Sequence, residues 1–281
     1  MISATTISPL NRRIVDDGGG FDPIASAFIT AAGITGATQQ AALNQLVLDL
    51  KGSGSTTNNT DVWSKIYAAY PYCPIDNSTA SLTAYKFNLK DPRDLDAAFR
   101  ITWVNSPTVA VSGINGNATN QYGNTNFNPN SQSVSQNSAS LTSSLTTDNN
   151  FTDAEIGATS VSTDLWLAPR WGGEGVLSAA NANVNLSDSS IGTSIGIFTI
   201  TRLDSSSQIL YYNGNLSTTD VEPSTTPINA ELFILAVNAS GSANRYSNRT
   251  HTFDVIAQGL TASEAKDLAD AISTYNTTLG R

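Results

Sequence analysis

Apolar and polar side chains alternate with a period of two residues through much of the second half of the chain. Segment 161–167 shows this alternation, and segment 208–212 runs into Asn213-Gly214, two residues that tolerate positive φ. A two-residue period is typical of half-buried strands, and an Asn-Gly pair between two strands predicts a tight hairpin. Segment 195–202 is apolar on both faces and is expected to be a further strand. The pattern therefore predicts a β-rich body.

The composition agrees with this fold class and argues against several kinds of partner. Thr, Ser, Asn and Gly are abundant while Lys and Glu are scarce, which disfavours a helical bundle. A net charge of -9 with only 14 Lys and Arg residues argues against binding to nucleic acid or to an anionic membrane. No apolar segment is long enough for a signal peptide or a membrane span, so we expect synthesis in a cytoplasm and no membrane insertion.

Two short helices are expected ahead of the strands. Asp22 and Pro23 have the residue types of an N-cap and a first helical position, and Gly33 is expected to end that helix. Thr35 is expected to cap a second helix, whose apolar stripe ends before Gly52.

Further helices are expected at two other places. Spacings of three and four residues predict a short helix that ends before Pro71, and a capping box of Thr261 and Glu264 predicts a C-terminal helix over 261–279. The residues with that spacing are Trp63, Ile66, Tyr67 and Tyr70. We therefore expect a helical pad over residues 21–72 and a β-sandwich over residues 83–281, which includes the C-terminal helix.

The stretch from Tyr85 to Val104 combines two expected strands with a dense cluster of charge. Alternation predicts strands at both of its ends, and Asp91-Pro92 predicts the turn between them. Two arrangements of the charges remain open. One is a solvated corner in which each exposed pair contributes less than about 1 kcal/mol, and the other is a partly buried, non-catalytic network with arginines as fork donors. The network would comprise Asp91, Arg93, Asp94, Asp96 and Arg100.

The segment that follows, residues 104–150, is strongly polar. A structureless segment of this length is improbable inside a compact domain. We therefore expect strands near 109–111 and 138–145, with 113–129 as a long surface loop.

Several segments resemble known families. FNLKDPRDLDAAFR, preceded by a Tyr-Pro segment and by helices of the type TQQAALNQLVLDLKG, resembles proteins of bacteriophages and prophages, especially those of Bacteroidetes hosts. QILYYNGNLS looks like a strand, turn and strand of laminin-G-like domains, and AELFILAVNASG and NRYSNRTHTFDVIAQGLTASEAKDL resemble their closing strands and the following helix. The resemblance covers most of the chain from about Phe21 onward. It implies a concanavalin A-like, laminin-G-like antiparallel β-sandwich, or jelly roll.

The same resemblance implies a bacteriophage virion structural protein, namely a spike, fibre or surface protein that mediates host attachment through a lectin-like sandwich. Its expected partners are other virion proteins of the capsid or spike base, a host surface glycan or receptor, and further copies of itself in a homo-oligomer such as a trimer. Its expected place is the virion surface. A capsid decoration protein without receptor binding is the first alternative, and a glycan depolymerase is the second.

The first twenty residues end in a Gly run and are expected to form a flexible arm. Such an arm is either a frayed end or an anchor to the particle. The anchor contacts would be Pro9, Leu10 and Ile14.

Residues suited to catalysis are sparse. The Glu-x-Asp-x-Glu signature of glycan-cleaving enzymes on this kind of sandwich is absent, and the nearest approach, Asp153 and Glu155, is interpreted as a solvated strand start. The sole histidine, His251, is expected to be a packed or surface imidazole, and the sole cysteine, Cys73, a buried thiol. We therefore expect no enzyme and no cofactor. We also expect no metal, although calcium held by Asp and Asn oxygens is conceivable.

A sugar site needs only an aromatic face and a few fixed polar groups. The first candidate is the Gly- and Pro-containing loop over 167–174, which would display Arg170 and Trp171. The second candidate is the pair Tyr122 and Asn124 in the other long loop. A Trp between Gly residues can equally be a lid on the core or a subunit contact.

Overall fold

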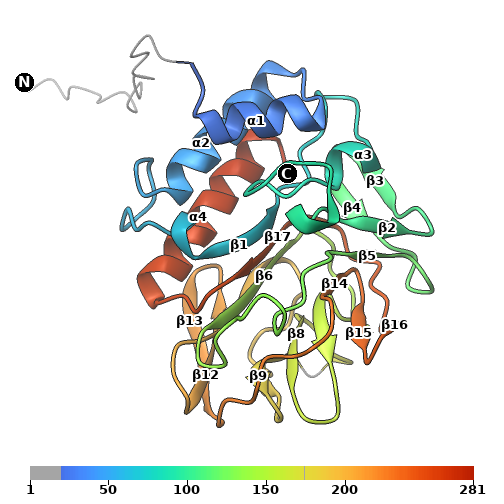
Figure 1. Ribbon diagram of the computed structural model, residues 1–281, viewed down its shortest axis with the longest axis vertical. Coiled ribbons are helices and arrows are strands. Elements are labelled where there is room, and N and C mark those ends of the chain that lie inside the picture. The colour runs from blue at the N-terminus through green and yellow to red at the C-terminus, as the bar shows by residue number, and fades with distance from the viewer. Residues whose placement is uncertain (1–19, 174) are drawn as a thin grey trace, which may run out of the picture.

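Two stacked, mainly antiparallel β-sheets form the body of the protein in the computed structural model (Figure 1). The structure describes residues 20–173 and 175–281, so the expected anchor contacts Pro9, Leu10 and Ile14 lie outside the described residues. Helices from the N-terminal part, drawn in blue, and from the C-terminal part, drawn in red, pack together beside the sheets (Figure 1). The β-sandwich fold class predicted from the sequence is confirmed.

The helices are α1 (Pro23–Ala32), α2 (Ala37–Leu50), α3 (Leu82–Tyr85) and α4 (Ala262–Thr278), with short 3-10 helices η1 (Trp63–Lys65) and η2 (Asp96–Ala98). The first sheet has the order β13-β12-β11-β6-β17-β4-β3, with β1 also paired to β17. Its strands are β1 (Ile66–Tyr70), β3 (Thr108–Ala110), β4 (Gly113–Asn115), β6 (Ala139–Leu145), β11 (Gly196–Arg202), β12 (Ser207–Tyr212), β13 (Asn215–Val221) and β17 (His251–Ala257).

The second sheet has the order β10-β9-β8-β7-β14-β5-β2, with β15 paired to both β7 and β16. Its strands are β2 (Thr102–Val104), β5 (Tyr122–Asn124), β7 (Ile156–Thr159), β8 (Asp164–Ala168), β9 (Val176–Ala182), β10 (Leu186–Asp188), β14 (Phe233–Ile234), β15 (Val237–Ala239) and β16 (Ser242–Asn244). Among the described residues, the strand pairs are antiparallel except β15 with β7, which is parallel.

Helix ends follow local sequence chemistry in two of the three longer helices. The Asp22 carboxylate accepts a hydrogen bond from the Ile24 amide, and Gly33 ends α1 in the left-handed conformation with φ of 67°. Thr261 and Glu264 form the predicted capping box of α4. The prediction that Thr35 caps α2 is wrong, because the N-cap is Gly36 and the Thr35 amide instead donates to the Ile75 carbonyl.

The predicted helix over residues 63–70 is also wrong. Only Trp63–Lys65 forms a 3-10 turn, and Ile66–Tyr70 is strand β1. Ala69 and Val255 are partners in the antiparallel register of β1 and β17. Pairing with β17, whose residues are all buried, outweighs the helical spacing, because β1 is apolar on both faces and fits either pattern.

Of the two strands predicted at the ends of the stretch from Tyr85 to Val104, the first is absent and the second is shortened to β2 (Thr102–Val104). Residues 82–85 are helix α3, and the following turn contains only an isolated bridge between Asn88 and Asp91. The Asn88 side chain is buried: its oxygen accepts from the Ala69 amide, and its amide donates to the Ala98 carbonyl. These side-chain bonds replace a strand ladder, so the alternation at 85–90 did not predict a strand correctly.

The predicted hairpin at Asn213-Gly214 is confirmed, with φ of 50° and 75° at its two central residues. Strands at 108–110 and 139–145 match the expectation for the polar stretch. The prediction of a continuous loop over 113–129 is wrong, because it contains β4 and β5, one in each sheet.

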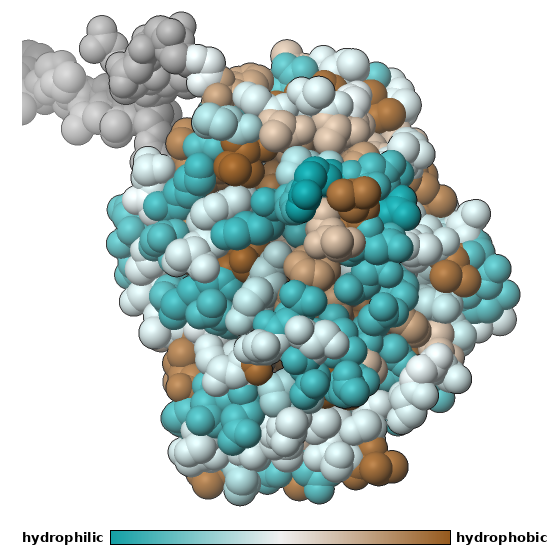
Figure 2. Space-filling view, in the orientation of Figure 1, coloured by the Kyte–Doolittle hydropathy of each residue, from teal (hydrophilic) through white to brown (hydrophobic). Residues whose placement is uncertain are grey.

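The apolar core lies between the sheets and under the helices. Leu141, Phe198 and Phe253 of the first sheet and Leu167 and Ile234 of the second are buried in one contiguous cluster. On the face shown in Figure 2, apolar residues form small separate groups among polar ones. No helix in the described parts of the chain is long and apolar enough to cross a membrane.

Candidate functional site

Two places in the structure gather polar side chains, and the first is a buried charge cluster between the sheets. His251 opens β17, and its Nδ1 and Nε2 atoms each lie 2.8 Å from a carboxylate oxygen, of Asp254 and Glu155 respectively. The second Glu155 oxygen accepts from Arg249, and all four side chains have zero exposure. Glu155 directly precedes β7, so the cluster joins the two sheets.

Pairing within the cluster keeps Glu155 ionised and His251 protonated. Burial opposes ionisation of Glu155, but the Arg249 charge and hydrogen bonds from His251 and Ser247 lower the pKa of Glu155 to about 2. Burial likewise opposes protonation of His251, but Asp254 and Glu155 raise the pKa of His251 to about 9. His251 is therefore an imidazolium at neutral pH, and it donates to both carboxylates.

This cluster contradicts the interpretation of Asp153 and Glu155 as a solvated strand start. Both residues are buried, and burial together with the Glu155 charge raises the pKa of Asp153 to about 6. No substrate can reach the fully buried imidazole without rearrangement of the sandwich. The cluster therefore serves the fold, and the chemistry available to a ligand lies elsewhere.

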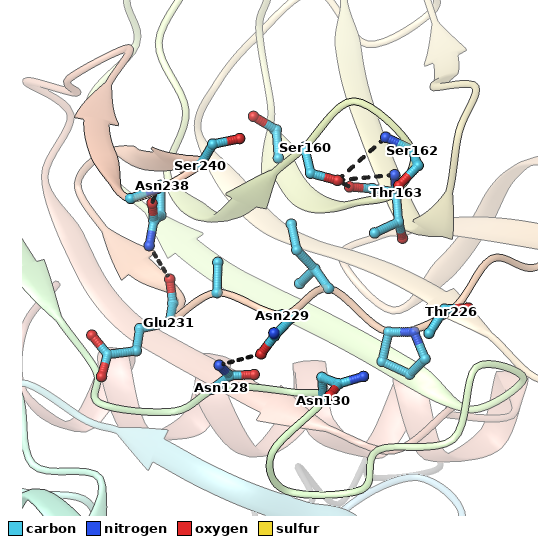
Figure 3. A pocket seen from close by; sticks show the side chains of 15 residues that line it. Asn128, Asn130, Ser160, Ser162, Thr163, Thr226, Asn229, Glu231, Asn238 and Ser240 are labelled. Atoms are coloured by element: carbon cyan, nitrogen blue, oxygen red, sulfur yellow. Dashed lines mark hydrogen bonds between the residues drawn. The ribbon is translucent and has the colours of Figure 1, made fainter.

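The second place is a polar hollow of about 740 Å³ on the second sheet, which we call the central hollow (Figure 3). Three loops and one strap surround it. The loops are the β7–β8 turn, the β15–β16 turn and the segment after β5, and the strap is the irregular segment 222–231 that leads into β14. The polar lining residues are Asn128, Asn130, Thr159, Ser160, Ser162, Thr163, Thr226, Asn229, Glu231, Asn238 and Ser240.

The strap is irregular for a local reason and is fixed by tertiary bonds. Pro223 and Pro227 supply no amide donor, which disfavours a continuous ladder. Ile228 is only 1% exposed and anchors the strap in the core, while its carbonyl accepts from the Asn130 amide. The Thr225 hydroxyl lies 2.6 Å from the Thr163 hydroxyl, so the strap is also tied to the β7–β8 turn.

Side-chain bonds hold the lining groups in place (Figure 3). The Asn128 amide donates to the Asn229 side-chain oxygen at 3.0 Å, and the Asn238 amide donates to the Glu231 carbonyl at 2.8 Å. The Glu231 carboxylate accepts from the Asn124 amide at 2.6 Å. A ligand would therefore meet oriented amides, hydroxyls and one carboxylate on a rigid frame.

Arg170 and Trp171 lie apart from the lining of the central hollow. The Arg170 guanidinium donates to Asp148 at 2.9 Å. The Trp171 ring packs edge-on against Trp166 with centroids 5.3 Å apart, and the Arg245 guanidinium lies 4.4 Å from its centroid. Trp171 thus covers a small second apolar cluster formed mainly by alanines and Trp166.

Tyr122 and Asn124 lie in β5 rather than in a loop. The Tyr122 ring packs against Phe233 with centroids 4.6 Å apart, and Asn124 reaches the central hollow only through its bond to Glu231.

The central hollow was not predicted from the sequence, because loops that are far apart in the chain form its walls. Clusters of Asn, Ser and Thr flanking Pro, as in 222–231, were the available signal.

The charged residues between Asp91 and Arg100 form ion pairs that are exposed to solvent. Arg100 donates to Asp94 at 2.7 Å and to Asp96 at 2.9 Å, and Arg93 pairs with Asp91. The side chains of Arg93, Asp94 and Asp96 are more than half exposed. The expectation of a partly buried network is therefore wrong for these three residues, and the solvated corner describes them.

Within residues 20–173 and 175–281, no group of three His, Cys, Asp or Glu side chains is arranged to hold a metal ion. Cys73 is buried, and burial raises the pKa of its thiol to about 12.

Comparisons with known proteins agree on the fold. No protein-family model and no curated protein matches the chain. A Trypanosoma rangeli sialidase in complex with 2,3-difluoro-KDN aligns with 82% of this chain and 38% of its own, at 13% identity and a TM-score of 0.51. A mutant of that sialidase displaying trans-sialidase activity aligns with 84% of this chain and 38% of its own, at 14% identity and a TM-score of 0.50.

A smaller structure is similar over nearly its whole length. Domain 4 of AbnA, an extracellular GH43 arabinanase from Geobacillus stearothermophilus solved with arabinotriose, aligns over 98% of its chain and 73% of this one. The identity is 16% and the TM-score 0.46. The chain spans about a third of the sialidases that it matches, and likeness at these identities concerns the fold alone.

Proposed function

We propose that this protein is a glycan-binding β-sandwich carried at the surface of a bacteriophage particle, where it mediates attachment to the host. The central hollow is the binding site. The observation that carries the glycan-binding part is the lining of this hollow, which presents fixed amides and hydroxyls around a volume of about 740 Å³. The placement on a virion rests on the sequence resemblance around Phe87 to Arg100.

The lining matches the chemistry of a sugar. A pyranose presents several hydroxyls, each of which is both donor and acceptor, and side-chain amides and hydroxyls satisfy both roles. Asn130, Asn229 and Ser240 are exposed in the hollow, while Asn128 and Asn238 behind them are held by hydrogen bonds. Because these bonds already orient Asn128, Asn229 and Asn238, little of their side-chain entropy is lost when a sugar binds.

Attachment by such a site depends on copy number. One shallow polar site binds weakly, since exposed hydrogen bonds replace similar bonds to water. Many copies on one particle raise the effective concentration of each further site and so the overall avidity. Binding needs no covalent step.

The test uses an array of immobilised bacterial surface polysaccharides, probed with the purified protein. We expect binding to some members of the array, and a loss of at least about tenfold for the variant Asn130→Ala/Asn229→Ala, since two hydrogen-bonding side chains are removed. Asn183→Ala, at an exposed asparagine outside the hollow, is the matched control and should bind as the unchanged protein does. Equal binding by the double variant would overturn the assignment of the site.

The two rival functions give different results. A decoration protein would bind purified phage particles and no host glycan, and it would not block infection. A depolymerase would release reducing sugar from the same polysaccharides. Electron microscopy of intact particles with a labelled antibody against the protein would test its place on the virion.

A further inference from the structure

The central hollow shares lining residues with two neighbouring hollows. We propose that the three form one open-ended trough for the interior of an uncharged glycan chain, with Phe99 as an aromatic subsite at one end. This inference rests on the proposed function and specifies its ligand class.

Shared lining residues place the three hollows next to one another. A hollow of about 530 Å³ at one end shares Glu231 with the central hollow. A hollow of about 350 Å³ at the other end shares Ser162, Thr163 and Thr226 with it. In Figure 3, Glu231 and Thr226 lie at opposite ends of the central hollow, so the two neighbours extend it in opposite directions along the strap.

Phe99 lines the first end of the trough and is partly exposed. Its backbone has φ of 58°, which is rare for a bulky residue, and its carbonyl accepts a hydrogen bond from the Tyr70 hydroxyl at 2.7 Å. The ring packs edge-on against Phe127 with centroids 4.9 Å apart. The fold therefore fixes an aromatic ring beside polar groups, which is what the apolar face of a pyranose requires.

The charge of the lining selects against acidic glycans. None of the described residues that line the three hollows is a lysine or an arginine, and Asp96 and Glu231 are acids. The nearby Arg100 is already paired with Asp94 and Asp96. A glycan carrying carboxylates or sulfates would meet like charge, whereas a neutral chain meets hydrogen-bonding groups and the Phe99 ring without a charge conflict.

The openness of both ends favours the interior of a chain over a chain end. Gln136 and Ser224 line the far end, and Phe99 and Gln132 line the near one. A single sugar can fill only one hollow, so affinity should rise with length until the chain spans all three. Substitutions at either end should then affect long oligomers more than short ones.

The experiment measures affinity by calorimetry for neutral oligosaccharides of one to six residues prepared from dextran, mannan and xylan, and for matched oligomers of alginate and polygalacturonate. We expect affinity to rise with length for at least one neutral series, and weaker binding to both acidic series. Phe99→Leu and Gln136→Ala should each weaken binding of the longest oligomer about fivefold, the equivalent of about one stacking or hydrogen-bonding contact. Binding of the mono- and disaccharide should change little in at least one of the two variants.

Phe151→Leu is the matched control for Phe99→Leu, because Phe151 is an exposed phenylalanine outside the trough. Gln136→Ala tests the inference independently if Phe99→Leu fails to fold, which thermal unfolding detects. Glycan binding without length dependence, unchanged by both end substitutions, overturns the trough but leaves the proposed function standing. Tighter binding of an acidic series overturns the charge argument. Absence of binding to every polysaccharide of the array overturns both proposals.

Discussion

The Nε2 atom of His251 lies 2.8 Å from the Oε2 atom of Glu155, with both side chains fully buried between the sheets. The two residues are 96 positions apart in the chain, one at the start of β17 and one next to β7. Their bond therefore fixes how the first sheet sits on the second. Three predictions test this bond, and a fourth tests the hairpin turn between β12 and β13.

Removal of the imidazole should strongly destabilise the fold. His251→Gln leaves the Glu155 and Asp254 carboxylates without their shared cation, and loss of one partner of a buried charge group costs about 3–5 kcal/mol. Urea denaturation gives the free energy of unfolding. Arg93→Ala, which breaks an exposed ion pair, should lower it far less, because solvent screens that pair. Similar values for the two variants would contradict a structural role of the cluster.

The titration of His251 can be observed directly, because it is the sole histidine. Its imidazole proton signals in an NMR titration should shift with a midpoint near pH 9, as the raised pKa of His251 requires. A group whose folded pKa is raised contributes stability in full below its unfolded pKa of about 6.5, and that contribution is lost as the pH rises through the folded pKa of about 9. A midpoint near 6.5 would show that the ring is not paired with both carboxylates.

The free energy of unfolding at acid pH should depend on Glu155. Its lowered pKa of about 2 contributes stability that is present above the unfolded pKa of about 4.5 and is lost as the pH falls toward 2. The difference in unfolding free energy between the unchanged protein and Glu155→Gln should therefore shrink over this range. Asp61→Asn, at an exposed carboxyl, is the control variant and is measured over the same pH range. A constant difference for Glu155→Gln from pH 6 to pH 2.5 would refute the assignment.

The hairpin between β12 and β13 should depend on Gly214 for two separable reasons. Its φ is 75°, and an added Cβ would lie 2.9 Å from the Cβ of Ala269 in α4. Gly241 has φ of 97°, but an added Cβ there meets nothing within 4 Å. Gly241→Ala should cost about 1 kcal/mol through backbone strain, and Gly214→Ala about 1–3 kcal/mol more through overpacking. Thermal unfolding of both variants separates the cost of backbone strain from the cost of overpacking. Equal losses of stability would show that α4 moves away from the added Cβ atom.

Local chemistry predicted some elements well because a few neighbouring residues decide them. The Asn213-Gly214 turn, the Asp22 N-cap and the Thr261 capping box each depend on contacts within a few positions. Strand β1 could not be predicted in this way, since its apolar residues satisfy both helical and strand spacing and only pairing with β17 decides between them. Long-range partners settle such ambiguous segments.

The candidate site was less predictable for the same reason. Neither His251 nor Glu155 belongs to a recognisable motif in the sequence. Their role as a buried charge pair depends on burial and on mutual pairing, which exist only in the folded protein. The central hollow combines four segments between positions 128 and 241, none of which carries a motif. The loop composition favoured Arg170 and Trp171 as sugar-binding residues. In the structure, Arg170 is paired with Asp148, and Trp171 packs against Trp166 and Arg245.

The position of β17 has a consequence for synthesis in the cell. This strand lies between β6 on one side and β4 and β1 on the other, and it begins only at residue 251. A nascent chain that has not yet emerged past that point holds two halves of a sheet with no strand to join them, and their unpaired edges are open to neighbouring polypeptides. The first sheet therefore closes only after β17 has left the ribosome, and until then its strand edges are open to chaperones that shield such edges.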